Sequence, residues 1–467
     1  MVFSSLPFLF IFLPITLLFF YLAPWKLKNI VLLIFSLIFY AWGEPIYIIL
    51  MIFTSFINYS AALKIEKYPK RKKLILSLSI IISLFLLGFY KYGNFFIENI
   101  NNLFSLSIDY LELSLPIGIS FYTFQAISYV IDVYRNDVIS EKNFFTFLTY
   151  ISMFPQLIAG PIVRYKTINE ELHNRKITYE KVTTGFLRFI RGLGKKVLLA
   201  NTIGNLVSEI SLIENNSIVL SWTLIIAFAL QIYFDFSGYS DMGIGLGKML
   251  GFSFLENFNY PYISTSITDF WRRWHISLSS FFKDYVYIPL GGNRVNKIRN
   301  IRNILIVWLL TGFWHGAEWN FICWGLYYGI ILLIEKFVLK DFLAKLPQFF
   351  KHLYSIFLIL LGWCIFYFED MSMLILQLKN MFGFNNINFI TNDTLYYLKN
   401  YIAILIIGVI LSTPICKIIS SKLANILNKK LKILIFILTL ILYISIYFLS
   451  IIYLVDSTYN PFLYFRF

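Results

Sequence analysis

The sequence predicts an all-α protein that crosses a membrane many times, and two features of the whole chain carry this prediction. Hydrophobic residues make up 58% of the 467 positions and charged residues only 14%, with a mean hydropathy of +0.71. Uncharged runs of about 20 residues, the length at which a helix spans a bilayer, recur along the whole chain. A water-soluble protein carries charge on about a quarter of its residues, so we expect lipid to surround most of this chain.

The apolar runs predict about ten to twelve membrane helices, some of them tilted or re-entrant. The runs cover residues 5–24, 29–50, 47–63, 74–90, 112–132, 144–162, 184–206, 218–236, 303–334, 350–368, 401–420 and 432–455. The apolar sequence at 29–63 and at 303–334 suits neither one helix nor two, which leaves the helix count open. The first run lacks a basic leader and a small-residue cleavage pattern, so we interpret it as a retained span.

Basic residues between the apolar runs predict how the chain lies in the membrane. The chain has 40 Lys and Arg against 25 Asp and Glu, a formal net charge of +15. The surplus is concentrated in short clusters typical of cytoplasmic loops, which favours membrane lipid over nucleic acid as a partner. We therefore expect a multi-pass protein of the cytoplasmic membrane, with its N-terminus outside and no nucleic-acid binding. The predicted cytoplasmic segments are Lys26 with Lys28, 64–73, 164–196, 294–302 and 417–432.

Two segments differ from the spanning runs. Segment 164–196 mixes cations with apolar residues, which predicts a helix at the membrane interface. Segment 252–303 is too polar to span, yet it is rich in Trp, Tyr, Phe and Pro. Irregular backbone at membrane depth must be buried in protein or line a wet cavity, because lipid cannot bond free N–H and C=O groups. Segment 252–303 is therefore the predicted functional core.

Only four histidines occur, and two of them define the candidate site. His315 opens an apolar run, where an ionisable side chain is a functional residue by default. Gly312 and Gly316 flank it one turn apart and leave room for a ligand or a second backbone. An imidazole can accept the proton of a hydroxyl that attacks a carbonyl, so we expect His315 to be catalytic, with Trp314 supporting it. The alternative is a packed histidine bonded to a backbone carbonyl.

His275 is the second candidate. Residues 266–269 resemble a capping box that opens a helix. On that helix Trp271, Trp274 and His275 share one face, and we expect this face to support the site. This hypothesis requires His275 to face the cavity that His315 lines. The alternative is a belt of tryptophans at the membrane interface.

Asp235 lies in an apolar stretch, where an unpaired charge is costly. It either orients a histidine or pairs with a Lys or Arg, and the sequence favours neither. The three cysteines lack the spacing of a disulfide framework or a zinc site, so no metal is expected. Cys323 is interpreted as an inert thiol rather than an acyl carrier. The chain also lacks G-x-S-x-G, H-E-x-x-H and Walker motifs, which argues against covalent hydrolases, metalloproteases and ATP-driven pumps.

Three motifs surround the two histidines. They are Trp-Arg-Arg-Trp-His at 271–275, Tyr-Ile-Pro-Leu-Gly-Gly at 287–292 and Gly-Phe-Trp-His-Gly at 312–316. Together they resemble the membrane-bound O-acyltransferase family, in particular its alginate O-acetyltransferase branch. Further stretches that look like this branch lie at 115–125, 154–164, 234–241, 257–262 and 461–467. The resemblance therefore extends over nearly the whole chain.

The resemblance implies one membrane domain over 1–467, in which tilted helices form a ring around a central funnel, with interfacial and re-entrant helices. Its parts are N-terminal helices at 1–110, a catalytic core at 111–335 and C-terminal helices at 336–467. The resemblance also implies that His315 is the catalytic residue and that His275 is the second histidine of the active site.

The resemblance further implies an acyl group taken from a cytoplasmic thioester, with acetyl-CoA as the donor and no tightly bound cofactor. The acceptor would be an extracytoplasmic glycan, reached with an SGNH-type extracytoplasmic partner. Our hypothesis for the donor's phosphates is contact with the basic residues Lys283, Arg294, Lys297 and Arg299. The oxyanion would be stabilised by His275 or Asn259.

Three alternatives stay open at this point. D-alanyl transfer to teichoic acid from a carrier-protein thioester uses the same pair of histidines, so the resemblance does not fix the acyl group. A transporter or flippase also has broken helices and buried charges, but it predicts repeated halves that the chain lacks. A non-catalytic scaffold would tolerate replacement of both histidines.

Overall fold

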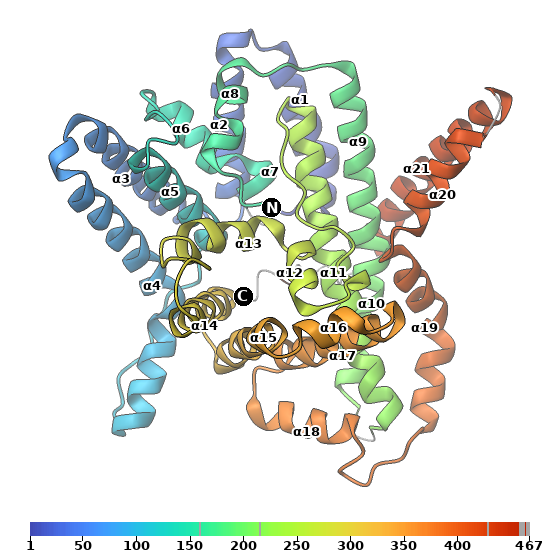
Figure 1. Ribbon diagram of the computed structural model, residues 1–467. Helices are drawn as coiled ribbons and strands as arrows, with labels where there is room; N and C mark the ends of the chain where they lie inside the picture. The colour runs from blue at the N-terminus through green and yellow to red at the C-terminus, as the bar shows by residue number, and fades with distance from the viewer. Residues whose placement is uncertain (158–159, 214–215, 427–428, 457–462, 464–467) are drawn as a thin grey trace. The chain divides into compact units, whose positions relative to one another are not determined.

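The computed structural model describes residues 1–467 except 158–159, 214–215, 427–428, 457–462 and 464–467 (Figure 1). Every regular element within these described residues is a helix, as predicted. The chain divides into two compact units, one formed by 1–189 with 240–256 and the other by 190–239 with 257–467. Helices α9 (Tyr179–Gly194) and α11 (Ile218–Met249) contribute residues to both units.

Seven helices in the described part of the chain are long and apolar enough to cross a membrane. They cover Ile48–Lys67, Pro69–Phe104, Ile218–Met249, Trp319–Phe337, Gln348–Tyr367, Asn392–Leu411 and Leu431–Asp456, and a shorter apolar helix covers Phe8–Leu22. Fewer helices reach this length than the ten to twelve expected. The run at 144–162 forms two short helices, the nine-residue α6 (Phe144–Ser152) and the four-residue α7 (Phe154–Leu157). The run at 303–334 is divided between α14 (Lys297–His315) and α15 (Trp319–Phe337).

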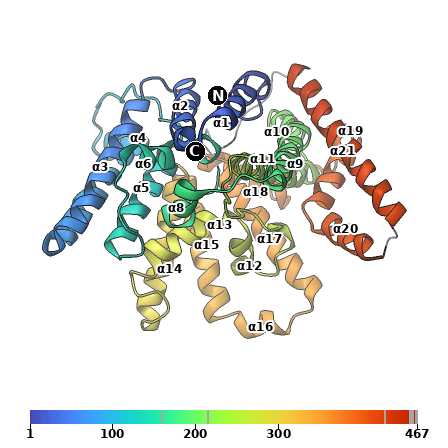
Figure 2. The ribbon, with the colours of Figure 1, turned by 90° about the horizontal axis from the view of Figure 1, so that it is seen from above.

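Unit 1 contains the N-terminal helices. They are α1 (Leu13–Leu22), α2 (Lys28–Ala41), α3 (Ile48–Lys67), α4 (Lys72–Phe104), α5 (Ile119–Tyr134), α6, α7 (Phe154–Leu157) and α8 (Tyr165–Asn174). Helices α3, α4 and α5 pack side by side (Figure 2). Asn58 on α3 joins α4 by accepting from Ser79 Oγ at 2.9 Å and donating to Ser83 Oγ at 3.0 Å. Such polar pairs connect helices in lipid, where burial of apolar surface provides no driving force.

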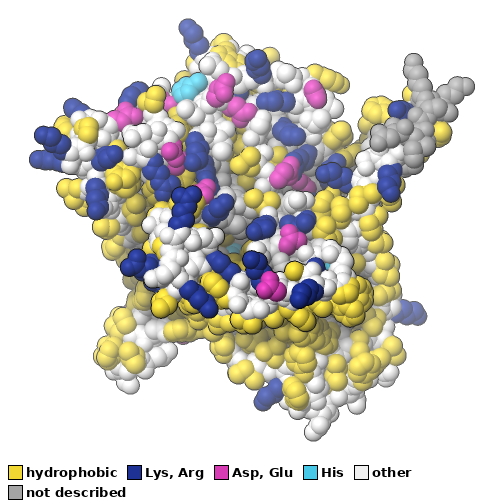
Figure 3. Space-filling model, in the orientation of Figure 1, with side chains coloured by type: hydrophobic (Ala, Val, Ile, Leu, Met, Phe, Trp, Pro, Cys, Tyr) yellow, Lys and Arg dark blue, Asp and Glu magenta, His cyan; other side chains and the backbone are white. Residues whose placement is uncertain are grey.

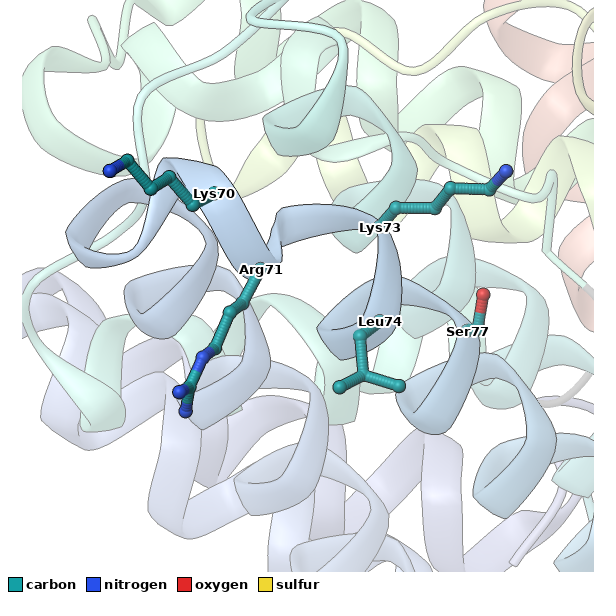
Figure 4. Close-up of a pocket in the computed structure, with 5 residues that line it drawn as sticks. All are labelled: Lys70, Arg71, Lys73, Leu74 and Ser77. Atoms are coloured by element: carbon teal, nitrogen blue, oxygen red, sulfur yellow. The ribbon is translucent and has the colours of Figure 1, made fainter.

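A surface hollow lies at the turn between α3 and α4. It is lined by Lys70, Arg71, Lys73, Leu74 and Ser77 (Figure 4). Three of these five side chains are cationic, which suits contact with anionic lipid headgroups. None of them belongs to the predicted active site. The cytoplasmic position of this turn stays a prediction.

Unit 2 contains residues 257–303 of the predicted functional core and the C-terminal helices. They are α10 (Thr202–Ser211), α12 (Ile267–Arg273), α13 (Ile276–Phe282), α14, α15, α16 (Lys340–Lys345), α17 (Gln348–Tyr367), α18 (Met371–Met381), α19 (Asn392–Leu411), α20 (Ile415–Ile426) and α21 (Lys429–Asp456). Polar caps fix where several helices begin. Asn296 caps α14, Asp370 caps α18, and Thr391 with Thr394 forms a capping box at α19.

The predicted interfacial segment 164–196 forms α8 and α9, and helix then continues through η4 (Lys195–Asn201) into α10. Cations of this segment bind partners within the protein. Arg188 pairs with Asp241 at 2.7 Å and also with Glu256, while Arg191 donates to Tyr443 Oη at 2.6 Å. These cations therefore connect helices, and a position at the membrane interface stays a prediction.

Helices α14 and α15 approach each other closely because both present glycine at their contact (Figure 1). A Cβ atom at Gly312 would lie 2.2 Å from the carbonyl oxygen of Phe321 and 3.1 Å from Cα of Gly325. Backbone atoms cannot move aside as flexible side chains can. The contact therefore fixes the end of α14, where His315 lies.

Replacement of Gly312 by alanine is expected to destabilise the protein by about 1–3 kcal/mol, because the added methyl group overlaps backbone. The matched control is Gly88→Ala on α4, where a Cβ atom meets nothing within 4 Å. There alanine should be neutral or stabilise by up to about 1 kcal/mol through its higher helix propensity. Thermal unfolding of the two purified variants in detergent checks this, and equal midpoints would contradict the close contact.

Candidate active site

The motif at 271–275 does not lie on one helix, so the prediction of a continuous helical face is wrong. Helix α12 begins as predicted, with Ser266 Oγ accepting from the Asp269 N–H at 3.0 Å. It ends at Arg273, and His275 adopts left-handed backbone angles, φ +44° and ψ +55°, before α13 starts. This conformation is unusual for a residue other than glycine. Such backbone persists where surrounding structure holds it, and it is frequent at functional sites.

The break has an identifiable cause in the preceding extended segment. The Asn259 N–H donates to the Arg273 carbonyl at 2.9 Å, and the Ile276 N–H donates to the Asn257 carbonyl at 3.0 Å. These bonds use backbone groups that a continuous helix would pair internally. The insertion of this segment therefore turns the chain at His275 and separates α12 from α13.

The start of α12 is held by Glu335, which sequence reasoning missed. This carboxylate is 5% exposed and accepts from the N–H groups of Ile267 at 2.6 Å and Thr268 at 2.9 Å. Thr268 Oγ1 also donates to it at 2.6 Å. A negative charge suits a helix N-terminus, where the backbone N–H groups are unpaired. The sequence signal was a lone carboxylate in an apolar run, which indicates a functional or structural partner.

His315 is the last residue of α14 and is 4% exposed. Its ring lies 4.9 Å from Trp324 and 5.4 Å from Phe366, measured between centroids. Gly316 follows, and a Cβ atom there would lie 2.1 Å from the Phe321 ring. Glycine at this position therefore lets an aromatic side chain pack directly beyond the catalytic candidate.

The two histidines belong to one aromatic cluster in unit 2. His275 is 1% exposed, and its ring lies 4.7 Å from Phe236 and 5.8 Å from Trp314. Trp314 also contacts His315, at 4.9 Å between centroids. Burial lowers the pKa of His275 to about 3, so this imidazole is neutral at physiological pH.

The two tryptophans of the 271–275 motif pack in the same aromatic cluster as the histidines. Trp271 contacts Trp324 at 5.4 Å, and Trp274 contacts Trp363 at 4.8 Å. Both are buried, at 7% and 2% exposure. This burial excludes the alternative in which they form a belt exposed to lipid headgroups. Trp271, Trp274 and Trp314 therefore lie where a supporting role requires them.

Asn259 does not join the cluster. Its side chain is exposed, and its carbonyl accepts from Arg273 Nη1 at 3.3 Å. The asparagine that reaches His275 is Asn257, which is fully buried with its Oδ1 3.2 Å from His275 Nδ1. In a regular strand residues 257 and 259 would face the same side. Asn259 lies in a bend of the backbone, so its side chain is exposed while that of Asn257 is buried. The sequence contains both residues in one motif and no signal that selects between them.

Asp235 pairs with a lysine rather than orienting a histidine. Lys196 Nζ lies 2.5 Å from Asp235 Oδ1, with both side chains at most 3% exposed. The Leu463 N–H also donates to Asp235 Oδ2, at 2.9 Å. The ion-pair alternative for Asp235 is therefore the one observed. Leu463 is the one residue of the 461–467 stretch within the described residues.

The basic residues proposed for the donor lie on the surface of unit 2. Lys283 in η6 (Lys283–Tyr287), Arg294, Lys297 and Arg299 are all exposed. Lys and Arg side chains gather in this region, around α13, α14 and α16 (Figure 3). Within the described part of the chain none of the four forms an ion pair, so their charge is available to an anion.

The remaining candidates for chemistry contribute little. Cys323 is half-buried and forms no disulfide among the described residues, and neither does Cys364 or Cys416. In the same part of the chain, no group of three or more His, Cys, Asp or Glu side chains could hold a metal ion. The arrangement that stands out is a pair of buried imidazoles joined by Trp314.

Fold and site together define a multi-pass membrane protein with two histidines buried at a helix break and a helix end. The sequence pattern of the membrane-bound O-acyltransferase family matches residues 135–376, which include both histidines. The chain belongs to this family and is an O-acyltransferase of the cytoplasmic membrane. Family membership favours the enzyme over the transporter and the scaffold.

Similar proteins indicate which branch of the family this chain resembles. The probable alginate O-acetylase AlgI of Pseudomonas aeruginosa is 41% identical, over 82% of this chain and 75% of the relative. The peptidoglycan O-acetyltransferase of Helicobacter pylori is 35% identical, over 83% of this chain and 81% of the relative. The teichoic acid D-alanyltransferase of Streptococcus thermophilus is 31% identical, over 47% of this chain and 56% of the relative. The chain is therefore similar to the alginate O-acetylase branch.

Proposed function

We propose that this protein transfers acetyl groups from a cytoplasmic thioester, acetyl-CoA, toward hydroxyls of an extracytoplasmic polysaccharide. The observation that carries the proposal is the pair of buried histidines in one aromatic cluster, within the segment that matches the family. The names of the two relatives aligned over more than four-fifths of this chain support acetyl as the group and a glycan as the acceptor.

In the proposed reaction, a hydroxyl oxygen of the glycan or of a carrier attacks the thioester carbonyl. His315 takes the hydroxyl proton as the new C–O bond forms. The C–S bond then breaks, and the thiolate leaves with the proton that His315 returns. A thioester is already activated, so positioning of the two reactants and removal of this proton supply most of the catalysis.

The exposed cations of unit 2 suit the phosphates of the donor. Replacing both Arg294 and Lys297 by alanine is expected to raise KM for acetyl-CoA about two- to thirtyfold, because exposed ion pairs contribute about 0.2–1 kcal/mol each. The kcat should change little, since neither residue contacts the reacting atoms. The control is Lys70→Ala, in the other basic cluster. Steady-state kinetics at two salt concentrations checks this, and an unchanged KM would contradict the donor site.

The function is tested with purified protein in vesicles, isotopically labelled acetyl-CoA and an oligosaccharide acceptor, with and without an SGNH-type partner. Label that appears on the glycan supports the proposal, and dependence on the partner would establish a relay. Label that crosses the vesicle as unchanged acetyl-CoA would overturn it. Offering a D-alanyl carrier-protein thioester in a parallel reaction tests D-alanyl transfer, and preference for that donor would replace acetyl as the group.

A further inference from the structure

Asn257 is the centre of a buried hydrogen-bond cluster beside His275. It lies in the extended segment before α12 and is 0% exposed. Its Oδ1 is 3.2 Å from His275 Nδ1, 3.1 Å from the backbone nitrogen of Ser277 and 2.9 Å from Ser277 Oγ. One carboxamide oxygen therefore meets three groups that can donate, and one of these groups is the imidazole.

The backbone of α13 fixes which way the Asn257 carboxamide points. A backbone N–H can only donate, so the atom that faces the Ser277 N–H must be oxygen rather than the NH2 group. A flipped carboxamide would set two donors against each other in a buried site, which is unfavourable. The Ile276 N–H, which donates to the Asn257 carbonyl at 3.0 Å, keeps the two segments in this register.

This orientation determines the tautomer of His275. An amide oxygen only accepts, so Nδ1 must carry the hydrogen that bonds Asn257. Ser277 Oγ, at 3.4 Å from Nδ1, gives its own hydrogen to Asn257 and so presents a lone pair to the same N–H. A neutral imidazole carries one N–H, which leaves a lone pair on Nε2.

We propose that Asn257 is a positioning residue that holds His275 as the neutral Nδ1-protonated tautomer, so that Nε2 accepts a hydrogen bond from a hydroxyl of the acceptor. This reassigns His275, because Nε2 in this tautomer has no hydrogen with which to stabilise an oxyanion. Sugars carry several hydroxyls, so one can bond His275 while another gives its proton to His315. Only the nature of the acceptor depends on the proposed function; the tautomer does not.

The tautomer can be observed directly by NMR of the full chain in lipid nanodiscs with 15N-labelled histidine, because only four histidines contribute signals. The His275 signals, assigned by their loss in His275→Gln, should report a protonated Nδ1 and an unprotonated Nε2. Ser277→Ala should preserve this state, since the Ser277 backbone N–H still orients Asn257. Asn257→Leu should release it to a mixture. A protonated Nε2 in the unaltered protein would overturn the proposal.

Kinetics supply a second, independent readout. Asn257→Leu should lower kcat about 100-fold with KM for acetyl-CoA unchanged, as expected when a catalytic imidazole loses its tautomer. Asn257→Asp keeps an acceptor for Nδ1–H and should restore most of kcat. Its carboxylate raises the pKa of the His275 imidazole, and the charged imidazole has no lone pair on Nε2. As the pH is lowered, activity should therefore be lost at a higher pH than in the unaltered enzyme. An unchanged kcat in Asn257→Leu, or no rescue by Asn257→Asp, would contradict the positioning role.

These outcomes separate the inference from the proposed function. If His315→Ala retained glycan acetylation, the reaction scheme would fail while the NMR signature of His275 could still hold. If instead the signature were absent and His315→Ala were inactive, acyl transfer would stand and the assignment of Asn257 would fall.

Discussion

Alanine in place of His315 is expected to lower glycan acetylation at least about 100-fold while the protein still accumulates in the membrane. The imidazole is the group that takes the hydroxyl proton in the proposed reaction, and loss of such a general base costs about 10²–10⁴-fold. The side chain packs against Trp324 and Phe366, so the smaller residue leaves a cavity. His315→Gln separates the loss of the general base from the loss of packing. Glutamine fills more of the space than alanine, yet it should be equally inactive because it cannot take the proton.

The control for this experiment is His173→Ala. His173 lies on α8 with its side chain 49% exposed, and it pairs with Glu141 at 2.9 Å. Glu141 is only 6% exposed, but it keeps the hydrogen bond from Tyr165 Oη when His173 is removed. Neither His173 nor Glu141 belongs to the candidate site, so acetylation should be unaffected. Acetylation is measured on the isolated polysaccharide, and protein abundance by immunoblot of the membrane fraction. Retained acetylation in His315→Ala would remove this residue from the mechanism.

Loss of Lys196 is expected to have the largest effect on stability. Lys196→Ala leaves the Asp235 carboxylate buried without its cation, and breaking a buried pair in this way costs about 3–5 kcal/mol. The double variant Lys196→Met with Asp235→Leu removes both charges, so it should recover much of this loss. The recovery is incomplete because the Leu463 N–H then lacks its acceptor.

The matched control is Lys142→Ala, which breaks the pair with Glu66, where the side chains are 65% and 32% exposed. The expected cost there is at most about 1 kcal/mol. Thermal unfolding in detergent, monitored by resistance to a protease, compares the three variants. If the two lysine variants lost equal stability, the buried pair would not be contributing as its burial indicates.

The fold class could be predicted because its signal is local, and a local signal also made the two histidines candidates, which the structure places in one aromatic cluster. Long apolar runs indicate spanning helices, and a rare ionisable residue within them indicates function. The helix break at His275 could not be predicted, because its cause is a hydrogen bond from another segment. Ser266 indicated where α12 begins. Nothing in the motif at 271–275 shows that its backbone forms hydrogen bonds with Asn257 and Asn259 instead of continuing the helix.

The supporting residues were harder to predict for the same reason. Asn257 and Asn259 are chemically identical and lie in one motif, and only the packing of the extended segment decides which one is buried. For Asp235 the sequence left two kinds of partner open, a histidine or a cation. It could not identify Lys196, which lies on a different helix. Tertiary contacts therefore decide which polar residues serve the histidines and which serve the scaffold.

Helix α15 connects the surroundings of both histidines. Near its start Trp324 contacts His315, and near its end Glu335 holds the beginning of α12, which leads to His275. The two residues are about 16 Å apart along one helix, at 1.5 Å rise per residue. The length of this helix fixes the distance and the angle between the two residues. One residue inserted between Trp324 and Glu335 would rotate the two ends by about 100° relative to each other. Any engineered change of acyl specificity should therefore leave the length of α15 intact.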